Sequence, residues 1–238
     1  VGPHIFLVME FLGGPSLQGV HKRRLAVDPD EPAFDVDECL WLLEQLAPAL
    51  DYASAEGITH RDIKPGNVMF TQAFDADDNL TEVESEIKLC DFGIALVQQQ
   101  VAEGDEVSAT GTPPYMAPEV IAGERPDHRA DIYSMAATLY HLYCGAPPVR
   151  GRSLDDIYAK LKAGDFEPID SGNKPFDAAI MRALSLSPDG RPDNFDKFLY
   201  VASDGTLGQQ AAVPGPRPKS TPMRATLPAG CTVAFAPA

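Results

Sequence analysis

The stretch His60-Arg61-Asp62-Ile63-Lys64-Pro65-Gly66-Asn67 places a carboxylate, an ammonium group and an amide within eight residues. These groups suit a phosphoryl-transfer site, because Asp62 can accept a hydroxyl proton and Lys64 can neutralise charge on the transferred phosphate. Asn67 offers a carbonyl oxygen to a hard cation such as Mg²⁺. Since the Pro-Gly pair between Lys64 and Asn67 breaks a helix, we expect the three side chains on a loop.

Two further motifs follow in a recognisable order. Asp91-Phe92-Gly93 comes directly after Ile87-Lys88-Leu89-Cys90, an apolar run that predicts a short buried strand. Ala117-Pro118-Glu119 lies further on, behind Gly111-Thr112. Over roughly residues 5–200, this set resembles the signature motifs of the eukaryotic-like (bacterial-type) Ser/Thr protein kinases.

The resemblance implies a mainly α fold with a small β-hairpin, the large C-terminal lobe of a protein kinase. Residues 1–14 would be the last small-lobe strand and the hinge, residues 15–202 the large lobe, and residues 203–238 a flexible tail rich in Pro, Gly and Ala. In the family the Gly-rich loop, the strand lysine and its glutamate partner precede the hinge. We therefore expect the small lobe to be largely absent and the chain to be a fragment, a truncated gene model or a degenerate copy.

The resemblance also assigns catalytic roles. Asp62 would orient and deprotonate the substrate hydroxyl, and Lys64 would lie beside the γ-phosphate of ATP. Asn67 and Asp91 would hold the Mg²⁺ ions that bridge the nucleotide phosphates. Thr112 matches the threonine that contacts the catalytic Asp and Lys in Ser/Thr kinases, so the expected substrate is a Ser or Thr hydroxyl of a protein.

The hinge and the catalytic lobe would share the nucleotide. Residues 5–9 predict a strand, followed by a turn, and by resemblance Met9 is the gatekeeper. The backbone from Glu10 to Leu12 would hydrogen-bond to adenine, Ser16 would contact the ribose, and Met69 would form the floor under adenine. An ordinary edge strand and a plain core methionine are the alternatives.

The spacing of apolar residues predicts the helices. One runs over residues 35–56, where Asp35 and Glu38 form a capping arrangement and Pro48 kinks or splits the helix. Another runs over residues 130–144 and is apolar all round, so it should be central and buried. Further helices are predicted at residues 153–163, 177–186 and 195–201.

Three charged residues should be buried. By resemblance, Asp131 would hold the backbone of the catalytic loop, and Glu119 and Arg191 would form a buried ion pair that ties the activation segment to the helical lobe. Cys90 would lie at the back of the nucleotide pocket, where a small buried side chain and a reactive thiol are the two interpretations.

Two loops are polar. Residues 71–86 are acidic with little to bury, so we expect a mobile insert; a calcium loop is the alternative, although the spacing departs from an EF-hand. Residues 98–110 suit an activation loop. A phosphate on Ser108 or Thr110 would pair with Arg61, unless these hydroxyls merely keep the loop soluble.

The charge and composition of the chain limit the classes of molecule that it can bind. The formal net charge of −16 argues against binding to nucleic acid or to an anionic membrane, and it favours a basic protein substrate. The four cysteines form no Cys-x-x-Cys pair, so neither a zinc site nor a disulfide framework is indicated. No apolar run reaches the length of a membrane span. We expect a cytoplasmic protein or the cytoplasmic part of a membrane-anchored kinase.

Two functions from different classes fit the sequence. The first is the catalytic lobe of a protein Ser/Thr kinase, which uses ATP and Mg²⁺, acts on Ser/Thr hydroxyls of proteins and works with the missing small lobe as its partner. The second is a non-catalytic binding or regulatory module derived from a kinase.

Overall fold

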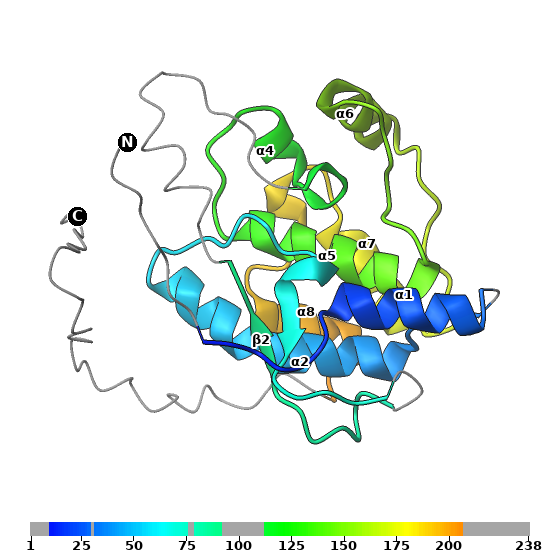
Figure 1. Ribbon diagram of the computed structural model, residues 1–238. Coiled ribbons are helices and arrows are strands. Elements are labelled where there is room, and N and C mark those ends of the chain that lie inside the picture. The colour runs from blue at the N-terminus through cyan, green and yellow to red at the C-terminus, as the bar shows by residue number, and fades with distance from the viewer. Residues whose placement is uncertain (1–9, 30, 76–78, 92–111, 207–238) are drawn as a thin grey trace, which may run out of the picture.

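The computed structural model describes residues 10–29, 31–75, 79–91 and 112–206, and helices dominate it (Figure 1). The α-helices are α1 (Leu17–Val27), α2 (Val36–Ala55), α4 (Pro118–Ile121), α5 (Arg129–Cys144), α6 (Leu154–Ala163), α7 (Lys174–Ala183) and α8 (Phe195–Ala202). The 3₁₀ turns are η1 (Pro65–Asn67), η2 (Pro113–Tyr115) and η3 (Pro188–Gly190), and the strands are β1 (Val68–Phe70) and β2 (Ile87–Leu89). The predicted class, mainly α with a small β-hairpin, is confirmed.

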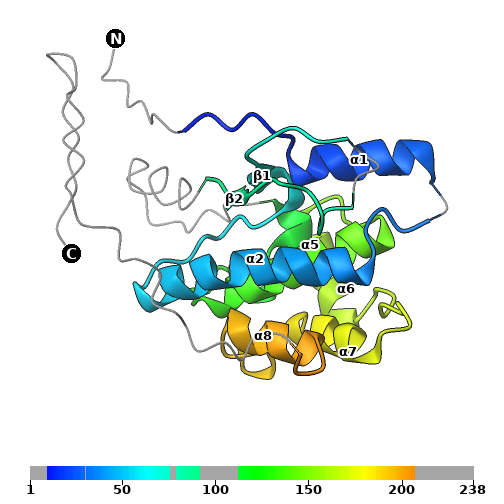
Figure 2. The same ribbon diagram turned by 90° about the horizontal axis from the view of Figure 1, so that it is seen from below.

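Helices α2 and α5 form the centre of the lobe. Almost every residue of α5 from Ala130 to Leu142 is buried, as its uniformly apolar sequence predicted. Helices α7 and α8 pack beneath α2 and α5, and α1 with the hairpin lies on the opposite side of α2 (Figure 2). Among the described residues, no helix is both long enough and apolar enough to cross a membrane.

Local capping signals placed most helix starts correctly. Asp35 and Glu38 form the predicted capping box at the start of α2, and Ser153 caps α6. Helix α2 continues through Pro48, so of the predicted kink or split the split is wrong and the kink stays a prediction; tertiary packing on both sides of α2 outweighs the missing donor. Helix α7 spans Lys174–Ala183 rather than 177–186, because Asn173 caps it and a proline is compatible with its first turn.

The predicted ion pair between Glu119 and Arg191 is present and buried. Both guanidinium Nη atoms donate to the carboxylate at 2.7 Å, and the two residues are 8% and 1% exposed. The remaining donors of Arg191 reach main-chain carbonyls, including that of Arg129 at the start of α5. Such full pairing is what makes two buried charges tolerable, and here it fixes α4 to α5 and η3.

The residues after the predicted hinge run alongside β1. Gly14 donates its N–H to the carbonyl of Phe70, and Phe70 donates to the carbonyl of Pro15. A Cβ atom at Gly14 would lie 2.4 Å from the carbonyl oxygen of Gln72, so a side chain has no room there. The strand predicted at residues 5–9, with Met9, lies outside the described residues.

The connection between β1 and β2 is better anchored than its acidic sequence suggested. Leu80 is 0% exposed, and its N–H donates to Glu38 Oε1 at 3.0 Å. Glu38 is itself held by Arg24, whose two Nη atoms bind its carboxylate at 2.7 and 2.9 Å. The prediction that residues 71–86 have little to bury is therefore wrong for Leu80. This apolar residue stands among acidic and polar residues in the sequence, which gave no sign that it is buried. Asp77 and Asp78, central to the calcium alternative, are outside the described residues.

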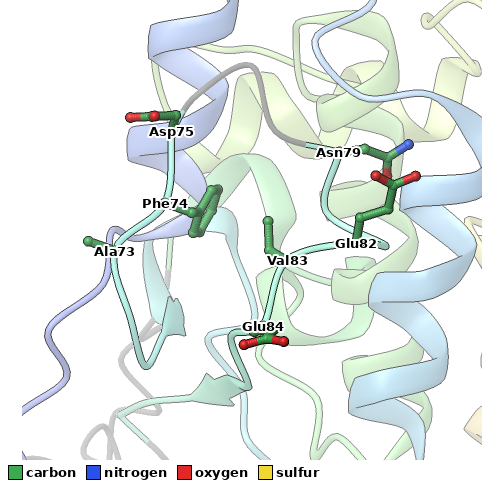
Figure 3. Close-up of a pocket in the computed structure, with 7 residues that line it drawn as sticks. All are labelled: Ala73, Phe74, Asp75, Asn79, Glu82, Val83 and Glu84. Atoms are coloured by element: carbon green, nitrogen blue, oxygen red, sulfur yellow. The ribbon is translucent and has the colours of Figure 1, made fainter.

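Side chains of this insert surround a pocket of ≈ 570 Å³. Phe74 and Val83 point toward one another across it, and the carboxylates of Asp75, Glu82 and Glu84 lie around them (Figure 3). None of the residues that line it is one of the expected catalytic or nucleotide-binding residues. The pocket belongs to the insert and is separate from the catalytic loop.

Replacing Leu80 by Ala tests whether the insert is part of the core. We expect Leu80→Ala to lower the free energy of unfolding by about 2–5 kcal/mol, because it removes a fully buried side chain. Urea unfolding measures this change. Glu82→Ala, an exposed substitution two residues away, is the control; equal stability of the two variants would show that the insert does not contribute to the core.

Candidate active site

The catalytic loop is held by a carboxylate on α5. Asp131 Oδ2 accepts the N–H of His60 at 2.6 Å, and Oδ1 accepts the N–H of Arg61 at 2.8 Å. Arg61 has φ of 69°, a left-handed conformation that is costly for a residue with a side chain. Burial raises the pKa of Asp131 to about 6, and the two N–H donors act against this shift. The role predicted for Asp131 is present in the structure.

His60 has a structural position under the loop. Its Nδ1 accepts the N–H of Asp62 at 3.2 Å, so its proton is on Nε2, which donates to the carbonyl of Cys90 at 3.0 Å. Burial lowers the pKa of His60, which keeps this tautomer neutral. His60 therefore joins the catalytic loop to the end of β2, and both its ring nitrogens are already used.

Asp62 lies at the centre of a dense set of donors. Lys64 Nζ donates to Asp62 Oδ2 at 2.6 Å. Asn67 Nδ2 donates to the same oxygen at 2.9 Å and to the Asp62 carbonyl at 2.8 Å. These contacts hold the carboxylate in one orientation, because each oxygen is fixed by donors from different directions.

Thr112 closes the site from a distant part of the sequence. Its N–H and its hydroxyl reach Asp62 Oδ1 at 3.1 and 3.2 Å. Its hydroxyl oxygen also accepts from Lys64 Nζ at 2.7 Å. The four residues predicted as catalytic, Asp62, Lys64, Asn67 and Thr112, are thus brought into direct contact.

The donors near Asn67 suit a hard cation. Its amide nitrogen is occupied by Asp62, which leaves the carbonyl oxygen as the group available for a ligand. The Cys90 N–H donates to the main-chain carbonyl of Asn67 at 2.8 Å, which brings the next residue, Asp91, close to Asn67; Asp91 has a φ of 66° and is exposed. Three or more His, Cys, Asp or Glu residues do not gather anywhere in the described ranges. An Asn and an Asp still fit Mg²⁺, because it is usually held by one or two carboxylates together with substrate phosphates.

The predicted nucleotide residues are spread along one edge. Met69 is half-buried in β1, pairs with Lys88 and bridges to Ser16. The Ser16 hydroxyl accepts the N–H of Gly19 and so caps α1. Glu10 makes an exposed ion pair with Lys88 at 2.6 Å, and Leu12 is partly exposed. Ser16 and Glu10 thus each have a structural contact in addition to the predicted one. Burial raises the pKa of the Cys90 thiol, which opposes the reactive-thiol interpretation.

One set of contacts near the site was not predicted from the sequence. The Tyr115 hydroxyl lies 2.6 Å from Nδ1 of His141, and the His21 ring meets the His141 ring edge-on at 4.7 Å. Tyr115 is three residues after Thr112, so this cluster is beside the catalytic contacts. Neither histidine belongs to a motif, and helical periodicity indicates only that His141 lies on α5.

Comparison with known proteins identifies the family. Residues 2–192 match the protein kinase domain family, and the chain belongs to it. PknH, a serine/threonine-protein kinase of Mycobacterium tuberculosis, is 33% identical over 196 residues, which are 80% of this chain and 28% of PknH. PkaA of Streptomyces coelicolor is 32% identical over 207 residues, 86% of this chain and 35% of PkaA. The chain thus spans about a third of these relatives.

The fold is also similar to a solved kinase. A crystal structure of the Mycobacterium tuberculosis PknI kinase domain, determined as a mutant, aligns with a TM-score of 0.55 and 28% sequence identity. The alignment covers 83% of this chain and 64% of the PknI chain. The family assignment made from the motifs, a bacterial-type Ser/Thr kinase with the large-lobe fold, is confirmed.

The contact of Asp131 with the catalytic loop can be tested by Asp131→Asn. The amide oxygen of Asn can accept only one of the two N–H groups, and its NH₂ group turns toward the other. We therefore expect the free energy of unfolding to fall by about 1–3 kcal/mol and amide hydrogen exchange at His60 and Arg61 to become faster. The matched control is Asp51→Asn, since Asp51 accepts two N–H groups at the start of α8. If both variants change exchange at His60 and Arg61 equally, Asp131 has no local role.

Proposed function

We propose that this chain is the catalytic lobe of a protein serine/threonine kinase, which transfers the γ-phosphate of ATP to Ser or Thr hydroxyls of a protein substrate. The observation that supports this most directly is the arrangement around Asp62, whose carboxylate is oriented by Lys64, Asn67 and Thr112. A carboxylate held in this way is pre-positioned to receive a proton.

In the proposed reaction each residue has a separate task. Asp62 accepts the proton of the substrate hydroxyl, and this requires one lone pair of its carboxylate to remain open to the substrate. Lys64 carries a positive charge from which the transferred phosphate oxygens gain stabilisation. Thr112 joins Asp62 and Lys64 through its hydroxyl, so it fixes the distance between the base and the cation.

The ligands of the proposed reaction are ATP and Mg²⁺. Asn67, through its carbonyl oxygen, and Asp91 would hold the metal, which neutralises phosphate charge when bound. The main chain from Glu10 to Leu12, with Ser16 and Met69, would hold the nucleoside. Support for this assignment is the hydrogen bond from the Cys90 N–H to the main-chain carbonyl of Asn67, which brings Asn67 close to the end of β2 and to the exposed residue Asp91.

The protein substrate and the regulation are also proposed. The net charge of −16 favours substrates with basic segments around the acceptor hydroxyl. The proposed location is the cytoplasm, either as a free protein or as the cytoplasmic part of a membrane-anchored kinase. The Nε atom of Arg61 is buried and has no hydrogen-bond partner among the described residues, which leaves a donor for a phosphate. Ser108 and Thr110, the proposed acceptors of that phosphate, lie outside the described residues.

Asp62→Asn tests the proposed base. In the complete gene product we expect kcat to fall by about 10²–10⁴-fold, because the amide cannot accept the proton, while the unfolding midpoint and the binding of Mg²⁺-ATP change little. Phosphate transfer to a basic protein from radiolabelled ATP measures kcat. Lys162→Gln, on the exposed end of α6, is the control. If the unaltered protein binds no nucleotide and transfers no phosphate, it acts instead as a non-catalytic module.

Thr112 allows a matched pair of variants. Thr112→Ser keeps the hydroxyl that contacts Lys64 and Asp62, whereas Thr112→Val keeps the shape and removes it. We expect Thr112→Ser to retain most of the activity and Thr112→Val to lose at least about tenfold in kcat, which corresponds to one lost contact to charged groups. Similar activities of the two variants would show that the hydroxyl is not needed.

A further inference from the structure

A buried cluster of rings connects η2 with α5 and α1. Tyr115 Oη lies 2.6 Å from His141 Nδ1. The His21 ring meets His141 edge-on at 4.7 Å, and Phe34 stacks on the other side of His21 with 6.1 Å between ring centroids. Tyr115 and His21 are 8% and 4% exposed. His141 is partly buried, so the cluster lies at the edge of the core.

The direction of the hydrogen bond follows from its surroundings. Burial raises the pKa of Tyr115 to about 12, so the phenol keeps its proton at neutral pH. Within the described ranges the Tyr115 hydroxyl makes no other hydrogen bond. Its proton is therefore best placed when Tyr115 donates to Nδ1, because the reverse arrangement leaves a buried phenol proton without an acceptor. His141 must then be the neutral tautomer with its proton on Nε2.

The groups around the His141 ring disfavour a second proton. Burial, the His21 ring on α1 and the Arg150 guanidinium after α5 lower the pKa of His141 to about 4. Burial also lowers the pKa of His21, and a hydrogen bond to the main chain of His141 acts against this. Nε2 of His21 is buried without a hydrogen-bond partner among the described residues, and a histidine, neutral or cationic, cannot compensate a positive charge on His141.

A short path leads from this hydrogen bond to the catalytic aspartate. Tyr115 donates its N–H to the carbonyl of Thr112 at 3.0 Å, which closes the η2 turn. Thr112 in turn donates its N–H and its hydroxyl to Asp62. Because η2 packs against α5 and α6, the contact of Tyr115 with His141 of α5 helps to determine where the turn lies relative to the catalytic loop.

We propose that His141 is a positioning residue for phosphate transfer: as a neutral imidazole it accepts the Tyr115 hydroxyl and thereby holds Thr112 against Asp62 and Lys64. This proposal rests on the proposed function. A proton on Nδ1 of His141 turns the acceptor into a donor, so acidification releases Tyr115 and loosens the η2 turn. Because this loosening disturbs the orientation of Asp62 and not the binding of ATP, kcat should change more than the KM for ATP.

Ring ¹⁵N NMR tests the geometry without any activity. We expect the Nε2–H tautomer of His141 and a pKa well below the ordinary value for histidine. In Tyr115→Phe the same pKa should rise, because the donor to Nδ1 is gone. An Nδ1–H tautomer, an ordinary pKa, or no change in Tyr115→Phe would overturn the proposal.

Kinetics on the complete gene product test the consequence. We expect the kcat of the unaltered protein to fall on acidification in two steps, one near pH 6 from Asp131 and one near pH 4 from His141. His141→Gln keeps an acceptor that does not titrate, so it should retain activity at pH 7.5 and the step near pH 6 but lose the step near pH 4. His141→Leu should lower kcat about tenfold at pH 7.5, since a displacement of about 1 Å costs up to 10²-fold. His128→Gln, a histidine that bonds to the Asp193 carbonyl, is the control.

The two experiments separate the possible failures. If the unaltered protein transfers no phosphate, the proposed function fails, and the NMR titration still decides whether His141 accepts the Tyr115 hydroxyl. If it is active but His141→Leu has an unaltered kcat and pH profile, His141 does not position the site. If His141→Leu does not fold, Tyr115→Phe takes its place, and an unaltered kcat in that variant equally overturns the proposal.

Discussion

Two main-chain N–H groups of the catalytic loop bind to one carboxylate on α5, and the site depends on this contact. A loop that carries Asp62 has no ladder of its own to fix it, and Arg61 is in a left-handed conformation that the surroundings must maintain. Asp131 binds the N–H groups of His60 and Arg61 together, so it fixes the peptide planes on both sides of His60, and the Asp62 N–H, bound by His60 Nδ1, fixes the plane after Arg61. The direction of the Asp62 side chain follows from these planes.

Helix α5 is a suitable support because it is buried on every side. The catalytic loop reaches it through Asp131, the η2 turn through His141, and α4 through the Glu119–Arg191 pair and the Arg129 carbonyl. Three segments that are distant in sequence are thereby positioned by the same rigid helix. This explains how Thr112, 50 positions beyond Asp62, meets its carboxylate from both its N–H and its hydroxyl.

The sequence predicted contacts that depend on short motifs and missed those that depend on packing. Asp35 and Ser153 marked helix starts because a capping side chain acts within three residues. The proposed catalytic residues could be named because the motif order is typical of the family, and the structure brings Asp62, Lys64, Asn67 and Thr112 into contact. By contrast, the predicted start of α7 at residue 177 missed the capping side chain of Asn173 and the proline that is compatible with the first turn. The burial of Leu80 and the pairing of His141 with Tyr115 arise from segments that meet only in the folded chain, so no local pattern indicates them.

Asp131 and His141, the two titratable groups of α5 that hold the site, change the free energy of unfolding in opposite directions as pH falls. Protonation of either one, however, weakens the contacts of the site. The pKa of Asp131 is raised to about 6, so its contribution to folding stability is lost as pH rises toward that value. The pKa of His141 is lowered to about 4, so its contribution is lost as pH falls from about 6.5 toward 4. Over this window the two effects on the free energy of unfolding oppose one another. The site, however, needs an ionised Asp131 and a neutral His141, and both conditions hold only above about pH 6. Acid would therefore disorder the catalytic contacts before it unfolds the lobe.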